Sequence, residues 1–303
     1  MAGTKMKKNY ADRSDVTFPH PFEPYPNLII NVALTGVIPT RRMTPHVPIQ
    51  PDEVIEDAAR CIDAGATIVH VHARDAEGQP TYRRSVFARI ISGIRKARRD
   101  AIICATTSGR RYGDFRQRAA VLDLDGESKP DMGSLTMGSL NFPDGPSVNH
   151  PDIVERLAVR MRERGIKPEI EALELGMVNS ANVLIKKGVL APPYYFNILL
   201  GSAHTAPATM LNLSAFIAGL PRNAVWSACG LGRFQFPINV AAIAMGGHVR
   251  VGIEDNLYYN NERTRLATNV EMVERAARVA AELGRAIATP AEARAMIGLP
   301  KAR

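Results

Sequence analysis

Short apolar segments alternate with amphipathic segments eight times along this chain, and the alternation constrains the fold more than any other feature. Strands are predicted over 28–34, 67–72, 101–107, 131–136, 168–175, 194–200, 223–228 and 248–253. Helices are predicted over 51–63, 84–98, 114–122, 150–164, 178–188, 209–219, 235–245 and 267–283. This order indicates parallel strands joined by right-handed helical crossovers. Eight such units over about 260 residues favour a closed (β/α)8 TIM barrel, an α/β fold. An open doubly wound sheet is the alternative, although no GxGxxG motif opens a helix after the first strand.

The first 26 residues lie outside this alternation. They contain Pro19, Pro21, Pro24 and Pro26 and have no helical period, which predicts an extended N-terminal arm. The chain is therefore divided into an arm over 1–26 and a single barrel domain over 27–303.

Composition is typical of a globular protein with a large core. Hydrophobic residues make up 46% and charged residues 22% of the chain, close to ordinary usage. No apolar run reaches the ~20 residues of a membrane span, and none follows the basic N-terminus as in a secretory signal. The three cysteines, Cys61, Cys104 and Cys229, form neither a CxxC pair nor a disulfide framework. These features predict a cytoplasmic protein without a membrane partner.

The net charge of +8 is spread over paired arginines along the chain. A solvated basic surface accounts for such a charge, and so does an anionic substrate or cofactor. No nucleic-acid motif accompanies the charge, so no nucleic-acid partner is predicted.

Two histidines that close the second predicted strand are candidate metal ligands. Alternate side chains of a strand share a face, so His70 and His72 point one way and Val71 the other. Two imidazoles at this spacing can bind one divalent metal. A pair of core histidines bonded to carboxylates is the alternative. The end of a strand favours the metal site, because a barrel forms its active site at the carboxyl ends of its strands.

The eighth predicted strand carries charges that can complete the site. While the chain stays extended, Arg250 and Glu254 share one face, so Arg250 can enter the barrel and Glu254 can reach its mouth. Only strand one separates strands two and eight in a closed barrel. Glu254 can therefore join the two histidines and leave a position open for substrate. Asp255 can turn inward where the strand ends. A surface ion pair of Arg250 is the alternative.

Further polar groups are expected at the same end of the barrel. Hydroxyls stand at the ends of strands three and four, on Thr106, Ser134 and Thr136. Glu169 and Glu171 share a face of strand five, and parity alone does not choose between them. A carboxylate inside a barrel is costly unless it is paired or bound to metal. Cys104 has the parity of Thr106 but no activating neighbour, and we interpret it as a core residue.

Several sequence blocks together resemble the β-keto acid cleavage enzyme family over roughly residues 27–299. The blocks are NVALTG (31–36), PIQPDE (48–53), HVHARD (70–75), MGSL (132–135), NF (141–142), KPEIE (167–171), GR (232–233), GGHVRVG (246–252), EDN (254–256) and ATPAEA (288–293). An HxH alone would not be specific, but the HVHARD and GGHVRVGIEDN blocks together are.

The resemblance implies a zinc-dependent TIM barrel that converts a β-keto acid and acetyl-CoA into acetoacetate and a new acyl-CoA. It also implies a homotetramer and assigns roles to residues at matching positions. The implied zinc ligands are His70, His72 and Glu254, the catalytic residues Arg250, Asp255 and Glu171, and the substrate-contacting hydroxyls Thr106 and Ser134. Thr136 shares a strand face with Ser134, which makes it a further candidate for substrate binding.

One position departs from the best-known family member, 3-keto-5-aminohexanoate cleavage enzyme. That enzyme holds the substrate amine with an acidic residue, and Ile38 stands at this position here. Isoleucine offers an ammonium neither charge nor a hydrogen bond. The substrate tail is therefore expected to be neutral or anionic. Arg41 and Arg42 follow on the same loop and either attract an anionic tail or form a solvated pair.

Two other functions remain as alternatives at this point. A metal-dependent carbon–carbon lyase of aldolase type would use the same enolate chemistry without CoA. A binding protein for anionic metabolites would need no open metal position. The sequence identifies neither the physiological β-keto acid nor the residues that contact CoA.

Overall fold

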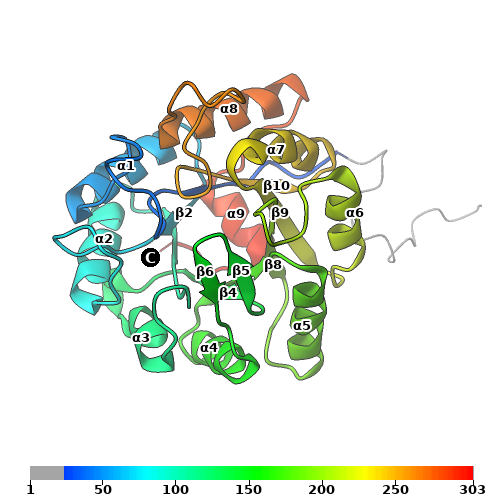
Figure 1. The fold of residues 1–303 in the computed structure, drawn as a ribbon. Helices are drawn as coiled ribbons and strands as arrows, with labels where there is room; N and C mark the ends of the chain where they lie inside the picture. The colour runs from blue at the N-terminus through cyan, green and yellow to red at the C-terminus, as the bar shows by residue number, and fades with distance from the viewer. Residues whose placement is uncertain (1–23, 303) are drawn as a thin grey trace, which may run out of the picture.

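The structure, a computed structural model, describes residues 24–302, and within them eight parallel strands close into a barrel (Figure 1). The strands follow one another around the barrel in the order β1, β2, β3, β4, β7, β8, β9, β10, and β10 pairs with β1. Their bounds are β1 Ile30–Ala33, β2 Ile68–Val71, β3 Ile102–Ala105, β4 Met132–Thr136, β7 Lys167–Ala172, β8 Tyr194–Leu200, β9 Ala224–Gly230 and β10 His248–Val251. The TIM-barrel prediction is confirmed, and the alternative of an open sheet is wrong.

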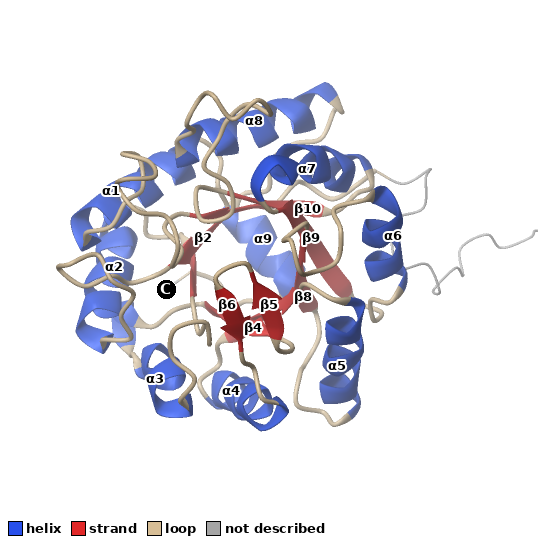
Figure 2. Ribbon diagram, viewed as in Figure 1, coloured by secondary structure: helices blue, strands red, loops and turns tan. Residues whose placement is uncertain are grey.

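Helices form a ring outside the strands (Figure 2). They are α1 Pro51–Asp63, α2 Arg84–Ala97, α3 Phe115–Ala119, α4 Pro151–Glu163, α5 Leu175–Lys186, α6 Met210–Ala218, α7 Gln235–Ala244 and α8 Asn269–Glu282. The predicted helices agree with these bounds to within three residues, apart from the one expected over 114–122. There α3 is short, and a 3-10 turn over Ala120–Asp123 follows it.

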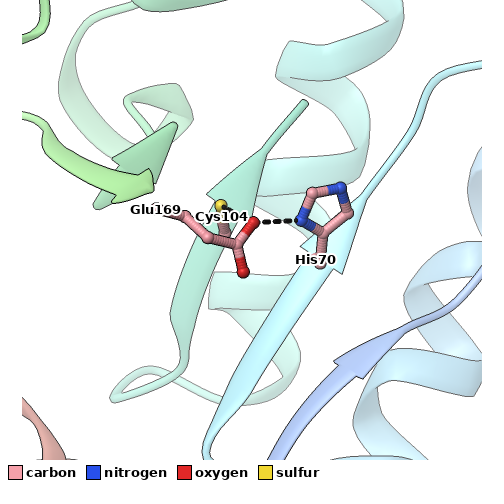
Figure 3. Close-up of side chains that lie close together, drawn as sticks. All are labelled: His70, Cys104 and Glu169. Carbon is pink, nitrogen blue, oxygen red and sulfur yellow. Dashed lines mark hydrogen bonds and ion pairs between the residues drawn. The ribbon is translucent and has the colours of Figure 1, made fainter. Parts of the chain in front are cut away.

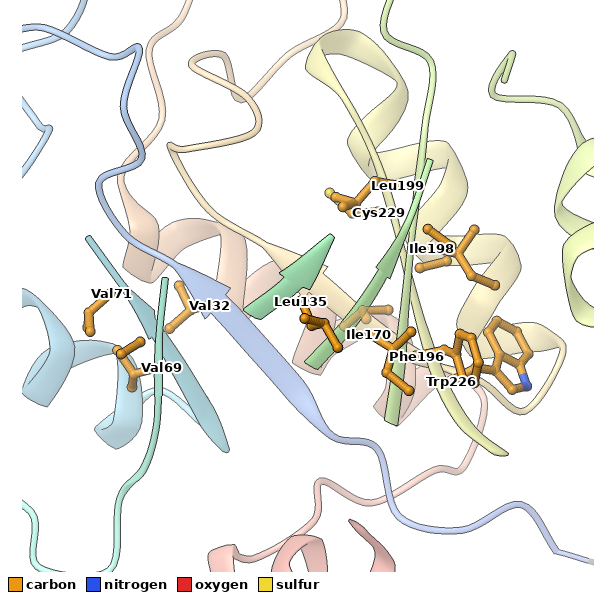
Figure 4. Packing of buried hydrophobic residues seen from close by; sticks show 14 of the residues in the cluster. Val32, Val69, Val71, Leu135, Ile170, Phe196, Ile198, Leu199, Trp226 and Cys229 are labelled. Atoms are coloured by element: carbon orange, nitrogen blue, oxygen red, sulfur yellow. The ribbon is translucent and has the colours of Figure 1, made fainter. Parts of the chain in front are cut away.

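The alternation of side chains along each strand separates two apolar layers. Val69, Leu135 and Phe196 point outward and pack in the layer between strands and helices (Figure 4). Ile68 and Ile102 point inward and belong to a separate cluster inside the amino-terminal end of the barrel. Successive residues of a strand face opposite sides. The inward-facing residues are therefore apolar near the amino-terminal end of the barrel and polar toward the carboxyl ends of the strands. This is why His70 of β2, and His72 directly after it, enter the barrel.

A ninth helix, α9 (Pro290–Ile297), was not predicted from the sequence. It begins with a capping box between Thr289 and Glu292, and proline at its first position suits a helix start. Ala293 and Ile297 are fully buried against the inward-facing cluster at the amino-terminal end. The helix therefore covers the end of the barrel opposite the carboxyl ends of the strands.

A small antiparallel hairpin between β4 and α4 was also not predicted. Its strands are β5 (Leu140–Phe142) and β6 (Gly145–Ser147). It projects in front of the ring of strands in Figure 2. Leu140 is buried, and the hairpin contributes side chains to the cavity described below.

The predicted arm over 1–26 falls almost entirely outside the described residues. Of the arm, residues 24–26 are described, and the Pro26 carbonyl accepts a hydrogen bond of 2.7 Å from Arg285 Nε. Among residues 24–302, no helix combines the length and the apolar character that a membrane crossing requires.

Candidate active site

A cavity of about 420 Å³ lies at the carboxyl ends of the strands, within the size range of small-molecule sites. Nine of the ten residues predicted for the site line it. These are Ile38, His70, His72, Thr106, Thr136, Glu171, Arg250, Glu254 and Asp255. The sequence therefore predicted most of the polar wall of the cavity.

The two histidines and Glu254 form one compact group of potential metal ligands. The Nε2 atoms of His70 and His72 are 3.3 Å apart, and His72 Nε2 is 3.2 Å from Glu254 Oε1. One donor atom from each residue lies within 4.8 Å of the other two. The second oxygen of Glu254, Oε2, is buried and has no hydrogen-bond partner within the described residues. Two facing imidazole nitrogens and an unsatisfied carboxylate oxygen are suitable ligands for a divalent cation.

Two glycines place Glu254 beside the histidines. The strand ends at Val251, two residues earlier than expected, because Gly252 turns the chain with φ +132° and lies against Ala33. A Cβ at Gly252 would lie 2.1 Å from the Ala33 carbonyl oxygen. Gly36, at φ +62°, faces the Glu254 side chain, and a Cβ there would lie 2.6 Å from its Cγ. A side chain at Gly36 would displace the Glu254 side chain, and one at Gly252 would collide with the backbone of β1.

Strand parity did not choose between Glu169 and Glu171, the family resemblance selected Glu171, and the structure gives the two residues different surroundings. Glu169 is fully buried, and its Oε2 accepts a hydrogen bond of 2.7 Å from His70 Nδ1 (Figure 3). Its Oε1 accepts hydrogen bonds from the side-chain amides of Asn31, at 2.5 Å, and Asn197, at 3.4 Å. A proton on His70 Nδ1 leaves Nε2 as the free nitrogen, which is the arrangement a metal ligand needs.

Cys104 lies beside the same carboxylate, with its Sγ 3.3 Å from Glu169 Oε2. His70, Cys104 and Glu169 make a second group of close potential ligands (Figure 3). However, His70 and Glu169 already bond each other, and burial raises the pKa of the Cys104 thiol well above its ordinary value. A neutral thiol is a poor ligand. Cys104 is buried, as its interpretation as a core residue requires.

Arg250 crosses the interior of the barrel between four carboxylates and is itself buried. It donates to Asp255 at 2.7 Å through Nε and to Glu254 at 2.9 Å, and it lies 3.5 Å from Glu171 and 3.9 Å from Glu169. The alternative of a surface ion pair is therefore wrong. Four carboxylates facing one guanidinium have three negative charges in excess when all are ionised. Uncompensated buried charge is unfavourable, and a divalent cation would offset two of the three.

The excess negative charge divides the carboxylates into two kinds. Burial, with repulsion from Glu169, raises the pKa of Glu171, and burial likewise raises the pKa of Asp255 despite its contact with Arg250. Burial acts on Glu254 too, but His72 and Arg250 hold the pKa of that carboxyl well below its usual range. Raised values identify groups that accept protons readily, and a lowered value identifies a group that stays ionised as a ligand.

The predicted hydroxyl groups differ in placement. The Thr136 hydroxyl donates to Glu171 Oε2 at 2.7 Å, and both residues line the cavity. Thr106 lines the cavity, and its hydroxyl accepts a hydrogen bond from the Ser108 backbone. Ser134 is buried below the cavity wall, where its hydroxyl accepts a hydrogen bond from the Thr107 backbone at 3.1 Å. Ser134 thus holds the ends of β3 and β4 together.

The wall of the cavity also contains an arginine that sequence reasoning did not single out for the site. Arg110, on the loop after β3, lines the cavity with Phe142 and Asp144 of the hairpin. Arg41 and Arg42, which had been considered for this role, are exposed, and Arg41 pairs with Glu53 on α1. The solvated interpretation of that pair is therefore correct. The Arg110-Arg111 doublet was visible in the sequence, but the hairpin that faces it was not predicted.

Comparison with known proteins identifies a family over nearly the same stretch. A family model described as beta-keto acid cleavage enzyme matches residues 27–299. Curated relatives include 3-oxoadipate:acetyl-CoA acetyltransferase from Cupriavidus necator, 37% identical over 90% of this chain and 95% of the relative. They also include 3-keto-5-aminohexanoate cleavage enzyme from Acetoanaerobium sticklandii, 36% identical over 90% of this chain and 99% of the relative.

A solved structure supports the fold independently. The apo structure of ObcA superposes with a TM-score of 0.75 at 22% sequence identity. The match covers 84% of this chain and 66% of the ObcA chain. At this level of identity the likeness concerns the barrel alone.

Proposed function

The chain belongs to the β-keto acid cleavage enzyme family, and from this membership we propose that it converts a β-keto acid and acetyl-CoA into acetoacetate and a new acyl-CoA. The observation that carries the proposal is the group of His70, His72 and Glu254 beside Arg250 and Asp255 in one cavity. The relatives named above act on 3-oxoadipate with acetyl-CoA and on 3-keto-5-aminohexanoate, and both compounds are β-keto acids. In this reaction the acyl group that contains the ketone carbon of the substrate moves to CoA, and the acetyl group of acetyl-CoA takes its place on the CH2–COO⁻ unit.

We propose that His70, His72 and Glu254 hold a zinc ion. The residues fit the ion because two Nε2 atoms face each other and Glu254 Oε2 is buried without a partner in the described part of the chain. Three protein ligands leave a position for substrate. A bound zinc ion would supply Lewis-acid stabilisation of negative charge on the substrate oxygens. Glu169 fixes the His70 ring by its 2.7 Å hydrogen bond.

The remaining charged residues carry out binding and proton transfer. The C2 carbon of a β-keto acid lies between two carbonyl carbons, and removal of its proton requires a nearby base. Asp255 lines the cavity and is held by Arg250 Nε at 2.7 Å, so we assign the base to Asp255. Arg250 also offers its positive charge to the substrate anion. Thr136 orients Glu171, another carboxyl group that lines the cavity.

The steps balance as an exchange of acyl groups. Asp255 takes the C2 proton, and the resulting carbanion attacks the acetyl carbonyl of acetyl-CoA, which forms a carbon–carbon bond and releases the CoA thiolate. The thiolate then attacks the original ketone carbon, and the bond between that carbon and C2 breaks. The carbanion of acetoacetate leaves and recovers the proton from Asp255. The products are acetoacetate and the new acyl-CoA, and no oxidant or reductant is consumed.

The tail of the substrate is proposed to be neutral or anionic. Ile38 lines the cavity where the aminohexanoate enzyme has an acidic residue. An ammonium beside isoleucine would lose its hydration and gain no partner there. A keto acid with an amine tail is therefore expected to be a poorer substrate than one with a methyl or carboxylate tail.

A panel of β-keto acids tests the proposed reaction. Each is incubated with acetyl-CoA and zinc-loaded enzyme, and the thioesters are identified by mass spectrometry. We expect a new acyl-CoA that contains the acyl carbons of the keto acid, together with acetoacetate in equal amount. His70→Ala is expected to bind no zinc at this site and to form no product. Cleavage that proceeds without acetyl-CoA would instead identify a carbon–carbon lyase.

A further inference from the structure

Arg110 is a cation in the cavity wall that the proposed chemistry does not use. Its side chain is 17% exposed, and its guanidinium carbon stacks 3.9 Å above the ring centre of Phe142. Stacking on an aromatic ring fixes the plane of the guanidinium, and the cation–π attraction adds to its stability. Arg110 is therefore a preorganised group rather than a mobile surface arginine.

Hydrogen bonds leave part of this guanidinium unused. One terminal nitrogen of Arg110 donates to Asp144, at the turn of the β5–β6 hairpin. The Nε atom is buried and has no partner within residues 24–302. A guanidinium has five N–H groups arranged to meet a carboxylate edge-on. Arg110 thus retains donors for a second acceptor.

The charges around Arg110 do not cancel. Arg111 lies 3.8 Å from the same Asp144, so one carboxylate faces two guanidinium groups. The three residues together have one positive charge in excess. The two arginines also hold the pKa of Asp144 below its usual range against the effect of burial, which keeps the carboxylate ionised. The part of the cavity wall at Arg110 is thus cationic, in contrast with the anionic surroundings of Arg250.

Resting on the proposed function, we infer that Arg110 binds a carboxylate at the far end of the substrate, so that the enzyme acts on β-keto dicarboxylates. Arg110 takes the tail carboxylate with the donors that Asp144 leaves free. The same cavity is also lined by Ile38, Leu140 and Leu231, which suit the methylene groups of such a substrate. The acyl-CoA product then has a free carboxylate at its end.

A binding and turnover comparison tests this inference. The probes are 3-oxoadipate, which ends in a carboxylate, and 3-oxohexanoate, which has a methyl in the same place. The wild type is expected to bind the dicarboxylate more tightly by calorimetry without acetyl-CoA, and to turn it over with a kcat/KM at least about 10-fold higher. A hydrogen bond to a charged group is typically worth a factor of this size. Arg110→Met keeps an apolar stem on Phe142 and is expected to abolish the difference.

Two further variants sharpen the test. Arg116→Met removes an exposed arginine of α3 that does not line the cavity, and it is expected to leave the preference intact. Asp144→Asn removes the competing negative charge beside Arg110 and is expected to increase the preference for the dicarboxylate. This change has the opposite sign to that of Arg110→Met, so a general loss of folding cannot imitate the pair of results.

The outcomes separate this inference from the proposed function. The inference would be overturned if the wild type bound the two probes equally. It would also be overturned if the preference for the dicarboxylate survived in Arg110→Met or decreased in Asp144→Asn. An Arg110→Met variant that raised the KM for acetyl-CoA and affected both keto acids equally would overturn it as well, because Arg110 would then serve the CoA phosphates. Preferential binding of the dicarboxylate without any acetyl-CoA-dependent product would overturn the proposed function and support the binding site.

Discussion

Replacing Glu169 with glutamine is expected to weaken zinc binding although Glu169 is not one of the three proposed ligands. Its Oε2 accepts a hydrogen bond from His70 Nδ1 at 2.7 Å, and its Oε1 accepts hydrogen bonds from Asn31 and Asn197. A carboxylate behind a metal-bound imidazole fixes the ring and increases its basicity. Glutamine keeps the shape of the side chain but removes the charge and one acceptor.

The hydrogen-bond geometry sets the size of the effect. If the glutamine oxygen faces His70, its NH2 group faces the amide donors of Asn31 and Asn197, and two sets of donors meet. If the amide is reversed, the NH2 group faces His70 Nδ1 and favours the tautomer that blocks Nε2. Either orientation leaves a buried donor unsatisfied, at about 1–3 kcal/mol. The expected loss in zinc affinity is therefore about 10- to 100-fold, the usual result of losing such a partner.

Competition with a fluorescent zinc chelator measures the affinity, and Glu171→Gln is the matched control. Glu171 is two residues further along β7 and has the same charge, but its hydrogen-bond partner is Thr136 rather than a histidine. Both variants lower the negative charge of the site by one. The affinity lost by Glu169→Gln beyond that of Glu171→Gln therefore measures the contribution of the His70 contact. Equal losses in the two variants would refute the reasoning, because charge alone would then explain the affinity.

Three further predictions address the base, the substrate tail and the stability of the barrel. Asp255→Asn is expected to lower kcat by about 10²-fold or more while zinc content stays unchanged. Near-normal turnover would mean that Glu171, and not Asp255, acts as the base. Ile38→Glu is expected to raise kcat/KM for 3-keto-5-aminohexanoate by about 10-fold through a charged hydrogen bond, and an unchanged value would mean that Ile38 does not face the tail. Burial, with repulsion from Arg285, lowers the pKa of His248 to about 3, below the value near 6.5 of an unfolded histidine. As the pH falls, the unfolded chain therefore binds a proton before the folded chain does. The free energy of unfolding is expected to decrease as the pH drops below about 6.5. In His248→Gln the slope of unfolding free energy against pH should be shallower by about 1.4 kcal/mol per pH unit between pH 6 and 4, and urea titrations with the wild-type slope would contradict this assignment.

Periodicity predicted the barrel because the strands of a closed barrel are buried on both faces and its helices on one. The same periodicity could not predict α9, which is a short helix outside the β/α alternation that covers the amino-terminal end. The hairpin was missed for a similar reason, since its strands have three residues each and pair only with one another.

The site was predictable where one strand orders its side chains, and less so where contacts join distant elements. His70 and His72 follow from the parity of β2. Glu169 and Glu171 have the same parity, and only the height of each residue in the barrel separates the one behind His70 from the one in the cavity. Arg110 became visible only with the hairpin in place. Metal binding, the tetramer and the cytoplasmic location remain predictions.

Isotope tracing tests the central claim most directly. The enzyme is incubated with a β-keto acid other than acetoacetate and with acetyl-CoA labelled with carbon-13 at both acetyl carbons, and the products are analysed by mass spectrometry. The proposed exchange predicts that acetoacetate contains both labelled carbons, at its methyl and ketone positions, and that the new acyl-CoA is unlabelled. Unlabelled acetoacetate, or cleavage of the keto acid while the label remains in acetyl-CoA, would contradict the proposed reaction.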